Sequence, residues 1–122
     1  MSIRTALGKL FAKPYKTINP ADANALLAGG AVLLDVRERH EWQAGHAPKA
    51  RHIPLSQLAS RHRELPADRM IITVCRSGTR SAQAARLLAG QGLPVANLSG
   101  GMHAWARAGL PLIAKAGTGR II

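Results

Sequence analysis

Short apolar runs alternate with short segments of helical character along most of this chain. We predict strands at 15–18, 31–36, 52–55, 70–75 and 95–98, and helices at 20–27, 38–44, 56–65, 81–90 and 102–108. The run at 31–36 is apolar except for Asp35, which is typical of a strand buried on both faces. Strands that alternate with helices form a parallel sheet covered on both faces by helices. The sequence therefore predicts a small α/β domain, with ligands expected at the carboxyl ends of the strands.

The length of 122 residues is enough for one hydrophobic core. We assign this domain to residues 17–112, a basic extension to 1–16 and a C-terminal tail to 113–122. No apolar stretch approaches the roughly 20 residues that cross a bilayer, and the first residues lack the apolar core of a secretory signal. The single cysteine excludes an internal disulfide and favours a reducing compartment. We therefore expect a cytoplasmic protein.

The chain is strongly basic, with a formal net charge of +11. Such a field attracts anions, so we expect a small anionic ligand and consider an acidic protein partner. Nucleic acid is not expected, because the few aromatic residues are not interleaved with the charges. In the extension, Ile3, Leu7, Leu10 and Phe11 fall on one face at helical spacing. A solvated extension and a helix that contacts a membrane or a partner both remain open.

The only cysteine lies between a predicted strand and a predicted helix. It opens a loop of small and basic residues, Cys75-Arg76-Ser77-Gly78-Thr79-Arg80-Ser81. Backbone N–H groups of such a loop can converge on one point, next to the positive end of the helix dipole. These groups and two arginines favour a thiolate over a thiol. We predict that Cys75 is a catalytic nucleophile, against the alternative of an inert buried thiol.

The rest of the loop is predicted to bind the substrate: Arg76, Ser77, Gly78, Thr79, Arg80 and Ser81. Arg76 and Arg80 have the side-chain type that suits oxyanions. Gly78 permits a positive φ and close approach of the backbone. Ser81 either contributes its hydroxyl to the site or caps the helix.

The remaining polar residues carry structural predictions. Asp35 and Arg37 are expected to pair with each other or to hold nearby loops, because buried charges need partners. Glu41 is expected to have a similar role. The five histidines do not have the spacing of metal ligands. We therefore predict neither a metal ion nor a cofactor.

Several short pieces occur together in an order typical of one protein family. They are Leu33-Leu34-Asp35-Val36-Arg37, Glu41-Trp42, Gly45-His46, Ile53-Pro54-Leu55, the Cys75 loop, Gly100-Gly101, Trp105 and Gly109-Leu110-Pro111. On these pieces the chain resembles the single-domain rhodaneses, homologues of thiosulfate sulfurtransferase, over residues 17–112. One departure is Lys49, which occupies a position where the family commonly has glycine.

The resemblance implies a reaction in two steps. A cysteine thiolate takes the outer sulfur of thiosulfate, releases sulfite and becomes a persulfide, and cyanide or a thiol then removes the sulfur. A partner-loaded persulfide carrier and a non-catalytic rhodanese-like interaction module are the alternatives. Related phosphatases and arsenate reductases have one more residue between cysteine and arginine than the four between Cys75 and Arg80. The shorter loop favours sulfur transfer over phosphate chemistry.

Overall fold

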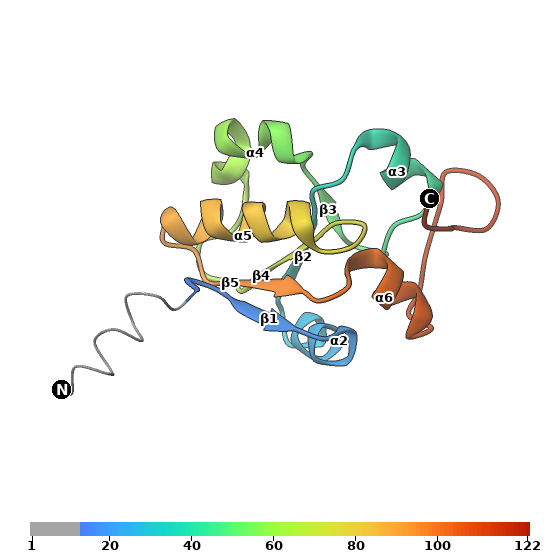
Figure 1. Ribbon diagram of the computed structural model, residues 1–122, viewed down its shortest axis with the longest axis horizontal. Coiled ribbons are helices and arrows are strands. Elements are labelled where there is room, and N and C mark those ends of the chain that lie inside the picture. Colours follow the sequence, from blue (N-terminus) through green and yellow to red (C-terminus); the bar gives the residue numbers. More distant parts are fainter. Residues whose placement is uncertain (1–12) are drawn as a thin grey trace.

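The computed structural model describes residues 13–122 (Figure 1). Its strands form one sheet in the order β1-β5-β4-β2-β3. They are β1 (Lys16–Ile18), β2 (Val32–Asp35), β3 (Arg51–His52), β4 (Ile71–Val74) and β5 (Val95–Leu98). Every neighbouring pair is parallel, which confirms the predicted α/β class.

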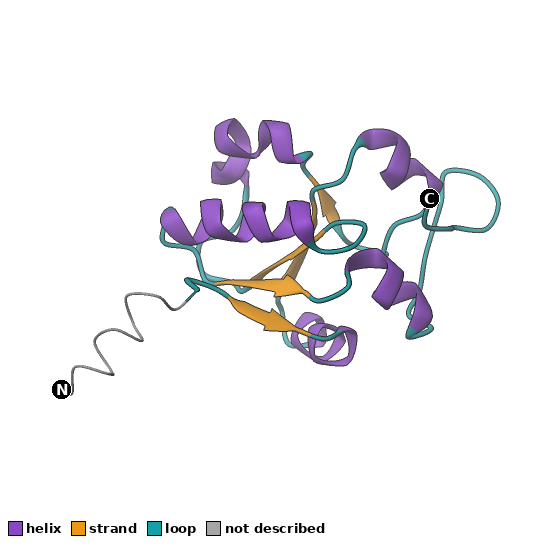
Figure 2. Cartoon of the chain, viewed as in Figure 1, coloured by secondary structure: helices purple, strands orange, loops and turns teal. Residues whose placement is uncertain are grey.

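Helices cover the sheet on two sides, so that the strands form a middle layer (Figure 2). The helical elements are α2 (Pro20–Ala28), α3 (Arg39–Ala44), α4 (Leu55–Arg61), the 3-10 helix η1 (His62–Glu64), α5 (Thr79–Gly90) and α6 (Gly101–Arg107). Leu58 of α4 and Leu88 of α5 belong to one apolar cluster. Ala23 of α2 and Trp105 of α6 belong to a second cluster. The α4–α5 layer and the α2–α6 layer therefore pack on opposite faces.

The central strands divide their side chains between these two clusters. Leu34 and Ile71 pack in the cluster with α4 and α5, whereas Leu33 and Ile72 pack in the cluster with α2 and α6. All four side chains are almost fully buried. Because successive strand residues point to opposite faces, a strand between two helical layers must be apolar on both. This explains the continuous apolar runs in the sequence.

Four of the five predicted helix starts differ from the structure by one or two residues, and two of these concern an expected cap. Helix α4 begins at Leu55, with Pro54 as its N-terminal cap, so Ser56 is not the cap that we expected. Helix α5 begins at Thr79 and is preceded by Gly78, whose φ is 122°. Ser81 therefore lies inside the first turn of α5, and the capping alternative for its hydroxyl is wrong. In both places the fixed or permissive backbone of the preceding residue sets the start of the helix.

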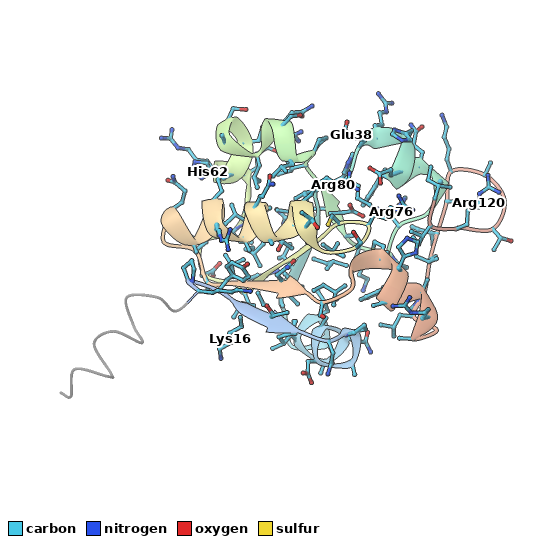
Figure 3. All side chains as sticks on the ribbon, in the orientation of Figure 1. Lys16, Glu38, His62, Arg76, Arg80 and Arg120 are labelled. Carbon is cyan, nitrogen blue, oxygen red and sulfur yellow. The ribbon has the colours of Figure 1, made fainter. Side chains whose placement is uncertain are left out.

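Both ends of the described chain pack against the domain. Tyr15 is 8% exposed and lies in the apolar cluster of α4 and α5. The segment 113–122, which we expected as a tail, returns to the end of α3. His46 and Ile113 form an antiparallel bridge, and the Arg120 N–H donates to the carbonyl of Ala44 over 2.9 Å. Figure 3 shows Arg120 on this returning segment.

Within residues 13–122, no helix has the length and apolar character needed to cross a membrane. The same residues contain no group of three side chains that could hold a metal ion. The residues of the extension that fall on one face at helical spacing, Ile3, Leu7, Leu10 and Phe11, lie outside the described part of the chain.

Candidate active site

Cys75 directly follows β4, the middle strand of the sheet, at its carboxyl end. The residue is only 1% exposed. Its Sγ accepts a hydrogen bond from the backbone N–H of Gly78 over 3.1 Å. Ser81 Oγ lies 3.3 Å from Sγ and 3.1 Å from the carbonyl oxygen of Gly78, so its single proton can be donated to either of them. Donors that point at a sulfur stabilise its negatively charged form. The loop therefore brings polar donors to the sulfur, in an arrangement that can hold an anion.

Hydrogen bonds from the neighbouring strands hold the far side of the loop. Thr73 of β4 donates through its hydroxyl to the carbonyl of Ser81 over 2.9 Å. Asn97 of β5 donates through its amide to the carbonyl of Gly78 over 3.4 Å. Gly78 and Ser81 are the two residues that donate to the sulfur. Strands β4 and β5 thus fix both donors, and the sequence analysis did not identify these two supports.

The start of α6 holds the other side of the loop. The Met102 N–H donates to the carbonyl of Cys75 over 2.8 Å, and the His103 N–H donates to that of Arg76 over 3.2 Å. Gly101 lies so close that a Cβ at this position would collide with the carbonyl oxygens of Cys75 and Arg76. Its φ is 59°, in the left-handed region that favours glycine. The double glycine at 100–101 is the sequence signal of this contact.

Arg80 is paired with a carboxylate rather than left free for a substrate. Its two terminal nitrogens donate to the oxygens of Glu41 over 2.6 and 2.9 Å. The hydrogen bond from Arg80 is the main reason why the pKa of Glu41 falls from 4.5 to about 2. The hydrogen bond to Glu41 raises the pKa of Arg80 against the opposing effect of burial. Arg80 therefore fixes the loop to α3, and its charge is compensated by Glu41.

Arg76 has a different environment. Its side chain is exposed, and its Nε donates to Nε2 of His103 over 3.1 Å. It belongs to none of the ion pairs within the described residues. Arg76 and Arg80 lie at the same end of the domain (Figure 3). Of the two loop arginines, Arg76 is the one whose guanidinium retains donors for an incoming anion.

Asp35 and Arg37 form a buried ion pair, which confirms the structural role predicted for them. Three hydrogen bonds of 2.7 to 3.0 Å join the two side chains. Arg37 also donates to the carbonyls of Glu41 and Gly45 at the two ends of a helical turn. The pair therefore holds α3, which in turn presents Glu41 to Arg80.

The two remaining loop residues point elsewhere. Ser77 and Thr79 are exposed and line a cavity of about 480 Å³ together with Lys13 and Arg86. Neither residue is among the hydrogen-bond partners of the sulfur within residues 13–122. The structure thus brings Gly78 and Ser81 to Cys75, places Arg76 and Arg80 beside it, and directs Ser77 and Thr79 to the side of β1.

Taken together, these features make the Cys75 loop a candidate thiol-based active site, at the carboxyl end of a strand in a parallel α/β sheet. The family model described as "Rhodanese-like domain" matches residues 19–108, and the chain belongs to this family. A sulfurtransferase of Allochromatium vinosum is 44% identical over 87 residues, which cover 70% of this chain and 81% of that protein.

Two further relatives agree with this assignment. The thiosulfate sulfurtransferase GlpE of Pseudomonas syringae pv. syringae is 37% identical over 92 residues, covering 75% of this chain and 87% of that protein. The crystal structure of a rhodanese-related protein from Thermoplasma volcanium superposes with a TM-score of 0.77 at 32% identity, covering 81% of this chain and 98% of that one. The fold and the sulfurtransferase family of this chain are therefore established.

Proposed function

We propose that this protein moves sulfane sulfur from thiosulfate or a similar anionic donor to cyanide or a thiol, through a persulfide on Cys75. The observation that carries the proposal is the pair of donors, the Gly78 N–H and the Ser81 hydroxyl, that point at Sγ. The same donors can stabilise a thiolate before the reaction and a persulfide anion after it. A relative named thiosulfate sulfurtransferase supports the choice of donor.

In the first step the Cys75 thiolate attacks the outer sulfur of thiosulfate. A new sulfur–sulfur bond forms on Cys75, the bond to the sulfonate sulfur breaks, and sulfite leaves with its electron pair. In the second step cyanide attacks the outer sulfur of the persulfide. Thiocyanate leaves, and the electron pair of the broken bond returns to Cys75. The cycle needs no external oxidant or reductant and no metal ion for its electron balance.

Arg76 is the residue that we assign to the sulfonate end of the donor. It is exposed at the loop and makes no ion pair within the described residues, whereas Arg80 forms an ion pair with Glu41. A guanidinium with free N–H groups suits an oxyanion. Arg80 instead acts as a positioning residue that keeps the loop closed around the sulfur.

Steady-state formation of thiocyanate from thiosulfate and cyanide tests the proposal. Cys75→Ser should abolish turnover, and Ser81→Ala should lower kcat by about tenfold, since a hydrogen bond to a charged group is lost. Arg76→Gln should raise the KM for thiosulfate more than it lowers kcat. Ser60→Ala, which removes an exposed hydroxyl on α4, is the matched control and should leave both constants unchanged. Turnover that survives in Cys75→Ser would refute the mechanism.

A further inference from the structure

A second cavity lies at the opposite end of the sheet from Cys75. It has a volume of about 500 Å³, within the usual range for small-molecule sites. Val32 and Arg51, which begin β2 and β3, line it. Cys75 follows the carboxyl end of β4, and all these strands are parallel. The cavity is therefore separate from the site of sulfur chemistry.

The floor of this cavity is apolar. Leu27 of α2, Leu33 of β2 and Trp105 of α6 line it, with Pro111 from the segment after α6. Helices α2 and α6 cover the same face of the sheet, and the cavity opens between them and the start of β2. An apolar floor of this kind accepts a hydrocarbon or aromatic group.

The rim of the cavity carries only positive charge. Lys49 and Arg51 line it from the segment that leads into β3, and Arg69 lines it from the segment before β4; the lining contains no aspartate or glutamate. The Arg51 guanidinium reaches the 3-10 helix η1, where its Nη1 donates to the carbonyl of Glu64 over 3.1 Å. None of the three takes part in an ion pair within residues 13–122. Asp68 lines an adjoining cavity with Arg69 without pairing with it. The exposed cations Lys49 and Arg69 beside an apolar floor complement a ligand that is anionic at one end and apolar at the other.

The backbone at Lys49 gives a second, independent indication. The Ala50 N–H donates to the carbonyl of Ala47 over 3.2 Å and closes a turn with Pro48 and Lys49 at its centre. Lys49 has a φ of 66° and is the only residue other than glycine with a positive φ in the described chain. A turn with proline in the second position and a positive φ in the third favours glycine there. Unfavourable backbone held in place at a cavity rim is typical of a functional position.

We propose that this cavity binds a small amphiphilic anion, with an aryl or short acyl body on the Leu33–Trp105 floor and its acidic group at Lys49 and Arg69. This proposal does not depend on the reaction proposed for Cys75. Ligands of this kind carry a carboxylate, sulfonate or phosphate attached to an apolar group. Binding should weaken as salt is raised, because exposed cations supply part of the affinity.

The two tryptophans make the test specific. Trp105 lines the cavity, and its indole N–H donates to the carbonyl of Pro111 over 2.9 Å. Trp42 stacks between His46 and His52 in a different part of the fold. The probe is 8-anilinonaphthalene-1-sulfonate, added to the isotope-labelled full chain and followed by the two indole N–H signals. We expect a saturable shift of the Trp105 signal with one probe per chain and no shift of the Trp42 signal.

Variants with altered charge distinguish a specific binding site from non-specific binding of the probe. Lys49→Gly and Arg69→Gln should each raise the dissociation constant of the probe by about threefold to fivefold, because each loses one exposed charge contact. Lys49→Gly should not lower the melting temperature, because glycine suits the left-handed backbone. Arg63→Gln, an equal charge change on exposed η1, is the matched control and should bind like the wild type. The uncharged analogue N-phenyl-1-naphthylamine should bind all of these variants with the same affinity as the wild type.

The proposal is overturned if the Trp105 signal does not move, or if both indole signals move together. It is also overturned if Lys49→Gly and Arg69→Gln bind the probe as tightly as Arg63→Gln does. Thiosulfate turnover measured on the same samples reports on the Cys75 site alone, so failure of either proposal is recognised separately.

Discussion

Replacing Glu41 by glutamine tests how the loop is fixed to α3. The substitution keeps the shape of the side chain but removes the charge that accepts two hydrogen bonds from Arg80. The pKa of Glu41 is about 2 in the fold, against 4.5 for the ordinary side chain. This difference corresponds to at most about 3 kcal/mol of folding free energy at neutral pH. Because a third of the Arg80 side chain is exposed, we expect a loss of about 1–2 kcal/mol.

The pH dependence of this loss follows from the direction of the pKa change. A carboxyl group whose pKa is lowered by folding stabilises the fold above its unfolded pKa, and this stabilisation disappears as the pH falls toward the folded pKa. The difference in unfolding free energy between the wild type and Glu41→Gln should therefore be constant above about pH 5. It should shrink by about half between pH 6 and pH 3.

Urea unfolding followed by tryptophan fluorescence at several pH values between 3 and 6 measures this difference. Histidines and other carboxylates titrate in both proteins, so their contributions cancel in the comparison. Glu64→Gln is a matched control, because Glu64 also binds an arginine, Arg61, through both oxygens, but on the exposed surface. That variant should differ little from the wild type at any pH. A difference for Glu41→Gln that is the same at pH 3 and pH 6 would refute the reasoning.

Three other changes have expected outcomes. Asp35→Asn should destabilise the fold by about 3–5 kcal/mol in urea unfolding, because it leaves the buried Arg37 without a counter-charge; an equally stable variant would show that the pair is not needed. Gly101→Ala should lower thiosulfate turnover at least about tenfold while the chain stays folded by circular dichroism, since the new Cβ displaces the carbonyls of the Cys75 loop. Wild-type turnover would mean that the loop position is not critical. Deletion of 114–122 should lower the melting temperature, because Ile121 packs in the second apolar cluster, and an unchanged melting temperature would contradict this role.

Much of the fold can be predicted from the sequence because the central strands are apolar on both faces. The predicted strand at 95–98 has the observed bounds, and β2 and β4 lie within their predicted ranges. Helix starts were less predictable. The hydroxyl residues at 56 and 81 resemble caps, but the backbones of Pro54 and Gly78 set the first turns instead. A capping side chain influences where a helix begins less than a backbone whose φ is fixed by proline or left free by glycine.

The candidate site was predictable at the Cys75 loop and less so in the residues that hold this loop in place. Cys75 and its loop stand out because one thiol, two arginines and a glycine follow a strand directly. The partner of Arg80 could not be assigned, since Glu41 lies far away in sequence and only the placement of α3 brings the two together. The segment 113–122 was expected as a tail because it lacks strong periodicity. Its contacts with Ala44 and His46 are made by the backbone, which leaves no pattern in the side chains.

The most direct test of the central claim is the intact mass of the protein after treatment with thiosulfate in the absence of reductant. Because Cys75 is the only cysteine, a persulfide can form at a single thiol. We predict that the wild type gains the mass of one sulfur atom and loses it again on addition of cyanide, while Cys75→Ser gains nothing. An unchanged mass, in folded protein whose thiol reacts with an alkylating agent, would contradict sulfur transfer from thiosulfate through Cys75.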